Sequence, residues 1–376
     1  MVADPMRDTI LPRLRLARSE GVGALTWRRL MERYDGDAAA ALDALPGLAE
    51  AGRRLAPAPI GPVLREIEAL AAMGARLLFV DDPAYPPLLA RLPNAPAMLA
   101  VLGAPDRLGL PAVALVGARA ASAGGRRIAE AMAEDLAKAG VVVVSGLARG
   151  IDAAAHTGAL RGVGKTVAVV PGGLDVPYPR ENAYLQERII AEGGAVVAES
   201  PLGMAPLARH FPARNRIVAG LCLGVVVVEA ARNSGTLITA RMGLEAGREI
   251  FAVPGSPLDP RSAGANDLIR QGAHLTETAE DVLELLPQAP HDLPLFSTRA
   301  AAVARGSPTP PGPSPTPSER GEQLLELLGV VAMPVDEVLR RCHLSAAEAR
   351  AVLLDLELEG LIEHLPGNRI SRKNPG

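Results

Sequence analysis

The chain has 376 residues, which is enough for two or three domains. Hydrophobic residues make up 48% of the sequence and charged residues 22%, which is typical of a folded globular protein and excludes a mainly disordered chain. Lysine and arginine number 39 against 42 aspartates and glutamates, so the formal net charge of −3 excludes a globally basic nucleic-acid binder but not a local basic patch.

The first 72 residues are predicted to form a small helical domain. Helical patterning is found in four segments: 11–17, 25–34, 37–45 and 62–73. A Gly21-Val22-Gly23 break separates the first two segments. Such a glycine turn is compatible with a helix-hairpin-helix motif, in which backbone N–H groups of the turn bind a phosphate. We favour the alternative, a plain helical hairpin.

Residues 73–287 are predicted to form a doubly wound α/β domain. Seven short and almost continuously apolar runs occur between 76 and 253: 76–80, 112–116, 141–144, 166–170, 195–198, 224–228 and 250–253. Parallel strands that are covered on both faces have this composition. Helical periodicity lies between the runs, at 125–139 and 182–191, so the pattern indicates a parallel sheet built from βαβ units.

Ligands of such sheets bind outside the carboxyl ends of the strands. Six segments follow the predicted strands and should share one edge: 117–125, 145–152, 171–180, the loop ending at 211–216, 229–236 and 254–257. Nearly all contain glycine, and five contain arginine: Arg119, Arg149, Arg180, the group Arg209, Arg214 and Arg216, and Arg232. Backbone N–H groups together with guanidinium groups suit phosphate, so we predict an anion site. The alternative is that these arginines are solvated or salt-bridged.

Several catalytic or nucleotide-binding motifs are incomplete. The segment 162–166 (GVGKT) resembles the end of a P-loop, but Ala159 stands at the first glycine and a strand follows, which disfavours ATP hydrolysis. No GxGxxG follows the strand at 112–116, no GxSxG surrounds Ser145 or Ser256, and the histidines form no metal-ligand cluster. His156, four residues after Asp152, is expected to make a helix-surface hydrogen bond rather than to act in catalysis.

The C-terminal part is predicted to be a linker and a winged-helix domain. Residues 306–318 (GSPTPPGPSPTPS) form a proline-rich tract within a linker at about 288–318. Beyond it, in 319–376, three helices are expected at 322–328, 335–341 and 346–359, and a β-wing at 361–365 and 369–371. Between 319 and 363 there are four arginines and ten acidic residues, so we interpret this domain as a protein-contact or regulatory module.

Cysteine usage and hydropathy bear on the location of the protein. Cys222 and Cys342 are far apart and form no CxxC pair, which favours a reducing compartment. The first residues are charged and lack an apolar signal segment, and the uncharged run at 217–228 is too short to span a bilayer. We therefore expect a cytoplasmic protein that does not contact a membrane.

Eight sequence blocks together resemble the DprA (Smf) family of bacterial DNA-processing proteins. In chain order they are 116–119 (VGAR), 144–152 (VSGLARGID), 155–160 (AHTGAL), 172–179 (GGLDVPYP), 211–220 (FPARNRIVAG), 234–240 (SGTLITA), 251–255 (FAVPG) and 262–269 (SAGANDLI). The resemblance implies a homodimeric, cytoplasmic protein that binds single-stranded DNA and loads the RecA recombinase during natural transformation. It also implies an extended Rossmann-like domain, a SAM-like or helix-hairpin-helix N-terminus and a C-terminal winged helix, with no cofactor and no catalytic residue.

The resemblance and the loops together give a set of candidate DNA-binding residues: Gly117, Ala118, Arg119, Ser145, Gly146, Arg149, Gly150, Gly172, Gly173, Arg209, Phe211, Arg214, Asn215, Arg216, Ser234, Gly235 and Thr236. Ala118 replaces the hydroxyl residue usual in the family, and Pro171 stands where glycine is frequent. Phe211 is the candidate for stacking on a base, and its alternative role is to anchor its loop in the core.

Two other classes of function stay open. The pieces Pro171-Gly172-Gly173, Gly235-Thr236 and Glu245 resemble the PGGxGTxxE motif of Rossmann-like nucleoside-monophosphate phosphoribohydrolases, although about 60 residues separate them here. The second alternative is a scaffold that binds only protein.

Overall fold

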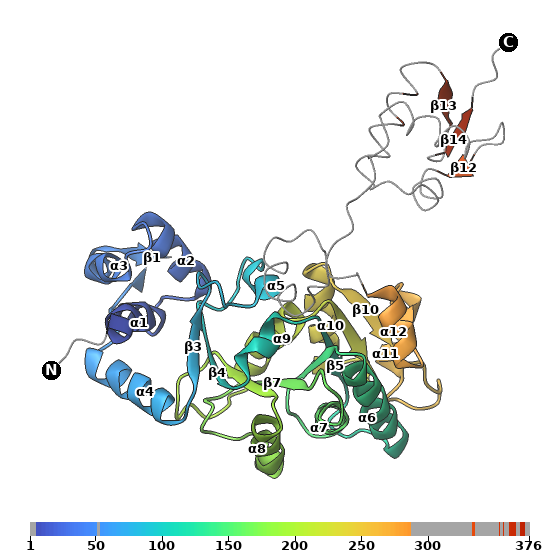
Figure 1. The fold of residues 1–376 in the computed structure, drawn as a ribbon, viewed down its shortest axis with the longest axis horizontal. Helices are drawn as coiled ribbons and strands as arrows, with labels where there is room; N and C mark the ends of the chain where they lie inside the picture. Colours follow the sequence, from blue (N-terminus) through green and yellow to red (C-terminus); the bar gives the residue numbers. More distant parts are fainter. Residues whose placement is uncertain are drawn as a thin grey trace, which may run out of the picture. The chain divides into compact units, whose positions relative to one another are not determined.

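The computed structural model describes residues 5–50, 53–286, 333–334, 353, 356, 361–365 and 369–372. The chain divides into two compact units, Met1–Asp292 and Leu293–Gly376 (Figure 1). The first unit holds the helical N-terminal part and the α/β sheet, and each unit is described by itself.

The N-terminal part is helical, as the sequence predicts. Its elements are α1 (Pro5–Ala17), α2 (Ala24–Arg33), α3 (Ala38–Ala44), the 3-10 helix η1 (Leu45–Gly47), the short strands β1 (Ala49–Glu50) and β2 (Arg53–Arg54), and α4 (Ile60–Ala72). Leu14, Leu16 and Trp27 are buried at its centre, and Trp27 stacks on Phe79 of the sheet with 6.5 Å between ring centroids. This core is therefore continuous with that of the α/β part.

Nine strands form the central sheet, in the order β11-β10-β9-β5-β6-β7-β8-β4-β3. Their bounds are β3 Arg76–Phe79, β4 Met98–Gly103, β5 Ala112–Val116, β6 Val142–Ser145, β7 Thr166–Val170, β8 Ala195–Ala198, β9 Gly224–Val227, β10 Glu249–Ala252 and β11 His274–Leu275. All pairings from β11 through to β8 are parallel, which confirms the predicted α/β fold for six of the seven apolar runs.

The sheet is mostly rather than wholly parallel. Among the described residues, the strand predicted at 76–80 pairs with β4 alone, and β4 is antiparallel to both of its neighbours, β3 and β8. The strand β4 was not predicted, because Met98–Gly103 contains Met, Leu and Ala, residues that favour helix as readily as a buried strand. Neither was β11, which is only two residues long.

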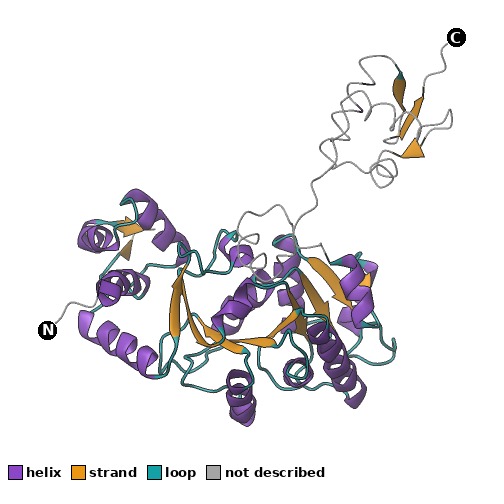
Figure 2. Ribbon diagram, viewed as in Figure 1, coloured by secondary structure: helices purple, strands orange, loops and turns teal. Residues whose placement is uncertain are grey.

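Helices cover both faces of the sheet (Figure 2). They are α5 (Pro87–Ala90), α6 (Ala123–Lys138), α7 (Ile151–Ala159), α8 (Ala183–Ala191), α9 (His210–Gly220), α10 (Gly235–Glu245), α11 (Ala263–Arg270) and α12 (Ala279–Leu285), with 3-10 helices η2 (Pro105–Gly109) and η3 (Arg180–Asn182). Val113 and Leu115 pack with α6, α7 and α12, whereas Ala114 and Val116 pack with α9, α10 and α11. Alternate side chains of β5 thus face opposite helical layers.

The second unit contains a three-stranded antiparallel sheet. Its strands are β12 (Met333–Pro334), β13 (Ile362–Leu365) and β14 (Arg369–Arg372), in the order β12-β14-β13. The β13–β14 pair is the predicted wing. Leu353 and Leu356, within the predicted third helix, have helical backbone and are buried. The linker and the helices predicted at 322–328 and 335–341 lie outside the described residues.

Candidate nucleic-acid interface

The parallel register brings the six loops that follow β5 to β10 to one edge of the sheet, as the sequence predicts. The loops after β5, β6 and β9, together with α9, enclose a cavity of about 910 Å³, hereafter the rim cavity. Ten of the candidate residues line it: Gly117, Ala118, Arg119, Gly146, Phe211, Arg214, Asn215, Ser234, Gly235 and Thr236. Arg232 and Arg261 lie in its wall as well.

An arginine and two aromatic rings meet where the rim cavity adjoins the loop after β7. The guanidinium carbon of Arg119 lies 4.8 Å from the centre of the Phe211 ring, a cation–π contact. Tyr178 approaches Phe211 edge-on, with 5.6 Å between ring centroids. The side chain of Arg119 is exposed and makes no hydrogen bond or ion pair with any residue that the structure describes. Sequence reasoning missed Tyr178, although it lies in the predicted loop 171–180.

Arg214 is the buried cation of the rim cavity. Its Nη1 donates a hydrogen bond to the carbonyl of Val169 at 2.8 Å, and its buried Nε has no partner among the described residues. Burial lowers the pKa of Arg214, and the nearby Asp152 carboxylate opposes that shift. Burial likewise raises the pKa of Asp152, which Arg214 counteracts. Asp152 also accepts hydrogen bonds from the N–H groups of Gly146 (3.1 Å) and Ala148 (3.3 Å), so it holds the loop after β6.

His156 supports the same loop from beneath. Its Nε2 accepts the N–H of Leu147 at 3.3 Å, and Leu147 has a left-handed backbone with φ +56°. Its Nδ1 donates to Oγ1 of Thr166 at 2.7 Å, because the Thr166 hydroxyl itself donates to Val143. Burial lowers the pKa of His156 to about 3, so the ring is neutral. The expected helix-surface bond to Asp152 is wrong, since His156 is fully buried and binds the loop and β7 instead.

Seven candidate residues do not line the rim cavity: Ser145, Arg149, Gly150, Gly172, Gly173, Arg209 and Arg216. Arg149 lies beside it, in a small hollow shared with Arg119, Tyr178 and Phe211. Ser145 is buried and donates to the carbonyl of Leu115. The two glycines of the loop after β7 are buried beneath residues 201–206, where the N–H of Gly173 donates to Met204.

Arg216 takes part in an internal ion pair instead of facing the rim cavity. Its guanidinium binds Glu199, at 2.7 Å from Nη2 to Oε1, and also donates to the carbonyl of Asn94. The sequence placed Arg209, Arg214 and Arg216 together on one loop. Because α9 begins at His210, Phe211, Arg214, Asn215 and Val218 share the face toward the cavity and Arg216 points elsewhere.

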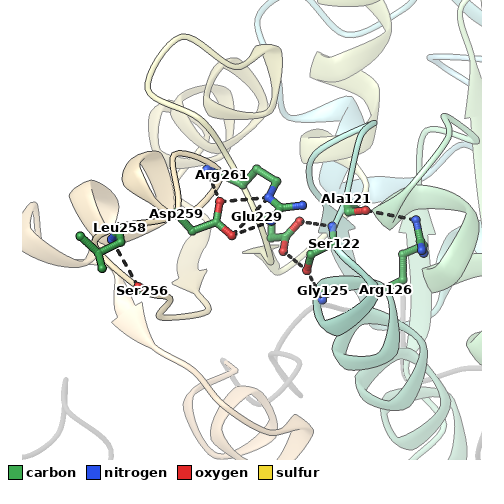
Figure 3. A network of polar contacts seen from close by, with 9 residues as sticks. All are labelled: Ala121, Ser122, Gly125, Arg126, Glu229, Ser256, Leu258, Asp259 and Arg261. Atoms are coloured by element: carbon green, nitrogen blue, oxygen red, sulfur yellow. Dashed lines mark hydrogen bonds and ion pairs between the residues drawn. The ribbon is translucent and has the colours of Figure 1, made fainter.

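A carboxylate of the protein occupies the N-terminus of α6 (Figure 3). Glu229, in the loop two residues after β9, accepts hydrogen bonds from the N–H (2.9 Å) and the hydroxyl (2.5 Å) of Ser122. Ser122 caps α6 by accepting the N–H of Gly125 at 2.8 Å. In dinucleotide-binding folds this first βα turn holds the pyrophosphate. Here Glu229 fills that position, which agrees with the missing GxGxxG.

Neither the P-loop-like segment nor the phosphoribohydrolase-like pieces form the structure that their chemistry requires. Residues 162–165 lie between α7 and β7, Thr166 begins β7, and Lys165 Nζ donates to the carbonyl of Leu160 at 2.8 Å, so the segment is not a P-loop. Thr236 and Glu245 lie at opposite ends of α10, and Gly172 and Gly173 are buried in another loop. The pieces therefore do not form the contiguous phosphoribohydrolase loop.

Comparison with known proteins places the chain in a family. The model of the DNA recombination-mediator protein A family matches residues 76–287, which is more than half of the chain. The chain belongs to this family. The DprA-like N-terminal HHH domain matches residues 7–69 and the DprA winged helix domain matches residues 308–368, so the second match begins within the predicted linker. The resemblance inferred from the sequence blocks is confirmed.

Individual DprA relatives agree with this assignment. The chain is 41% identical over 300 residues to Protein Smf of Escherichia coli, covering 78% of this chain and 76% of that one. The X-ray structure of DNA processing protein A from Streptococcus pneumoniae matches with a TM-score of 0.62 and 34% identity, over 74% of this chain and 98% of that one. A structure of DNA processing protein A from Helicobacter pylori, which addresses that protein's single-stranded DNA binding mode, matches with a TM-score of 0.51 and 30% identity, over 56% of this chain and 94% of that one.

The described helices also bear on whether this chain could cross a membrane. Among the described residues, none of the helices combines the length and the apolar character needed to cross a bilayer.

Proposed function

We propose that this DprA-family chain binds single-stranded DNA in the rim cavity. The observation that carries the proposal is the pairing of Arg119 with Phe211, which puts an exposed cation, one that forms no ion pair with a described residue, next to an aromatic ring. Single-strand binders combine a cationic groove with rings on which bases stack. The Helicobacter pylori relative, which has a single-stranded DNA binding mode of its own, supports the same ligand.

Each part of the cavity wall has a role in this proposal. Arg119, from the loop after β5, and Arg232, from the loop after β9, contact phosphates. The backbone N–H groups of this first loop approach the strand closely because Gly117 and Ala118 are small. Phe211 and Tyr178 stack on or bracket a base. Asp152, His156 and Arg214 hold the loop after β6 in place, and Arg214 also lines the cavity as a candidate DNA contact.

Further parts of the proposal rest on family membership and on the sequence pattern. They are the loading of RecA, a homodimer, a cytoplasmic location, the absence of a catalytic step, and domains at 1–72, 73–287 and 319–376 joined by a linker at 288–318. RecA loading is tested by strand exchange on DNA coated with a single-strand binding protein, where the chain should shorten the lag before RecA acts. An unchanged lag at saturating DprA would overturn that part.

The test of DNA binding is the affinity for a fluorescent single-stranded oligonucleotide, measured over a range of salt concentrations. Arg119→Ala should weaken binding and reduce the salt slope by about 0.7, the value for one phosphate contact on a single strand. Arg65→Ala is the matched control, because Arg65 is also exposed but lies on α4. Absence of wild-type binding at low salt would overturn the proposal, and cleavage of nucleoside monophosphates into base and ribose phosphate would favour the enzyme alternative.

A further inference from the structure

A second basic hollow lies across the sheet edge from the rim cavity. It is formed by the first turns of α6 and α7 and has a volume of about 450 Å³; hereafter it is the α6–α7 hollow. Arg126 and Arg127 stand on its α6 side, and Gly150 with small alanines makes up its α7 side. The rim cavity lies on the α9 and α10 side of the sheet, whereas this hollow lies on the α6 and α7 side.

The ridge between the two depressions is thin and basic. Gly150 has φ +77°, and a Cβ there would come within 2.3 Å of the carbonyl oxygen of Ala118, so the loops after β5 and β6 touch. The N–H of Ile151 donates to the same carbonyl at 3.2 Å. Arg119 and Arg149 are both exposed on these loops, and Arg149 forms a long, exposed ion pair with Glu181 (3.8 Å from Nη1 to Oε1) that a phosphate can displace. A strand that crosses the ridge therefore passes two further guanidinium groups.

The charge of the α6–α7 hollow is not neutralised by its one acidic residue. Arg126 donates to the carbonyl of Ala121 at 3.1 Å, so its guanidinium turns back to the end of the loop after β5 (Figure 3). Arg127 is exposed and has no hydrogen bond or ion pair within the described part of the chain. Glu130 is paired with Arg161 at 2.5 Å, and Arg161 also binds Glu134, so the Glu130 carboxylate already has a counter-ion. Two arginines without acidic partners remain.

The size of the rim cavity limits how much of a strand it holds. At about 910 Å³ it falls in the range of small-molecule pockets and can enclose only about one or two nucleotides. A longer strand has to leave the cavity, and its phosphates are favoured wherever unneutralised guanidinium groups lie.

We propose that the α6–α7 hollow is a second phosphate-binding site for the same DNA strand. The strand leaves the rim cavity over the Arg119–Arg149 ridge and lies against Arg126 and Arg127. This inference rests on the proposed function and extends it, because it assigns a direction to the bound strand. It predicts that the contribution of Arg126 and Arg127 depends on strand length, whereas the contribution of Arg119 does not.

The test compares thymidine oligonucleotides of about two and about 25 nucleotides: the short one fits within the rim cavity, and the long one exceeds the roughly 4–16 nucleotides of a usual single-strand site. The double variant Arg126→Ala, Arg127→Ala should bind the short oligonucleotide as the wild type does. It should bind the long one roughly 5- to 20-fold more weakly, with a salt slope lower by about 1.4 for two phosphates. Arg65→Ala, Arg76→Ala is the charge-matched control, since both of these arginines are exposed and lie on α4 and β3.

The outcomes separate the two proposals. If the wild type binds neither oligonucleotide, the proposed function itself fails. If Arg119→Ala weakens the binding of both oligonucleotides while the double variant binds both as the wild type does, only the second phosphate-binding site is overturned. Equal losses on both lengths also overturn it, because they place Arg126 and Arg127 at the rim cavity. Arg127→Glu keeps the Arg126–Ala121 bond and tests the same length dependence if the double variant does not fold.

Discussion

The guanidinium of Arg214 lies directly against the backbone of Gly146. A Cβ added to Gly146 would come within 1.7 Å of Nη1 of Arg214, a separation that no pair of non-bonded atoms can adopt. The same nitrogen donates to Val169 of β7 at 2.8 Å. One buried side chain of α9 thus joins the ends of β6 and β7, and it fixes the floor of the rim cavity.

Gly146→Ala should therefore disturb the site through Arg214. The added methyl group forces the guanidinium away from Val169, and overpacking of this kind costs about 1–3 kcal/mol in unfolding free energy. The affinity for single-stranded DNA should fall as well, because Arg214 and the 146–150 loop move together. Urea unfolding and oligonucleotide binding measure the two effects.

Gly109→Ala is the matched control, because nothing lies within 4 Å of a Cβ at Gly109. It should change the unfolding free energy by no more than about 0.5 kcal/mol. If Gly146→Ala behaves like this control, Arg214 can relocate freely and does not organise the cavity floor.

Much of the α/β fold could be predicted because a buried parallel strand is apolar on both faces. Val142–Ser145 and Gly224–Val227, for example, are buried along their whole length, and each contains three consecutive valines. Parallel strands put their following loops at one edge, so the rim was also predictable. The strand β4 was not, since no local signal distinguishes Met98–Gly103 from a buried helix.

The detailed site could not be predicted where it depends on helix phase or long-range packing. Pro212 suggests a loop, yet proline is tolerated in the first turn of a helix, and α9 begins at His210. That phase separates Arg214 from Arg216. The hydrogen bond between Glu229 and Ser122 joins residues 107 positions apart, and no spacing in the sequence predicts it.

Phe211→Ala should weaken single-strand binding more than it weakens the fold. Loss of one base–aromatic stack costs about 1–3 kcal/mol, which corresponds to roughly 5- to 150-fold in affinity. Phe211→Leu keeps apolar volume but lacks a ring, so it should bind almost as poorly as the alanine variant while retaining more stability.

The comparison of affinity with melting temperature distinguishes stacking from anchoring at Phe211. Tyr184→Ala is the control, because Tyr184 is 71% exposed on α8 and does not line the rim cavity. A large drop in melting temperature for Phe211→Ala, with full affinity in the leucine variant, would assign Phe211 to loop anchoring instead.

Stability should decrease on acidification because His156 is buried as the neutral ring. Its pKa is about 3 in the folded chain and 6.5 when exposed, so between these values the unfolded state binds more protons. The unfolding free energy should therefore fall by about 1.4 kcal/mol for each pH unit below about 6.5. Asp152 acts in the opposite direction, because its raised pKa favours the folded state at low pH.

His156→Gln isolates the histidine contribution, since both proteins retain Asp152. The variant cannot titrate at this position, while its side-chain oxygen can still accept the N–H of Leu147. Urea unfolding at pH 7.5, 6.5 and 5.5 should give a shallower pH dependence for the variant, with the difference from wild type growing toward acid. Parallel curves would show that His156 does not carry the pH dependence.

Glu229 should be replaceable by a free anion if its carboxylate serves the N-terminus of α6. Glu229→Ala leaves the N–H and the hydroxyl of Ser122 without their acceptor, at a cost of about 1–3 kcal/mol in unfolding free energy. Phosphate ions should then raise the melting temperature of the variant more than that of the wild type, because a helix N-terminus favours an anion.

Glu245→Ala, at the exposed C-terminal end of α10, is the matched control, and phosphate should raise its melting temperature no more than that of the wild type. Equal phosphate effects in all three proteins would mean that the N-terminus of α6 does not bind a free anion once the Glu229 carboxylate is removed. The turn would then resemble a nucleotide-phosphate site in its backbone fold alone.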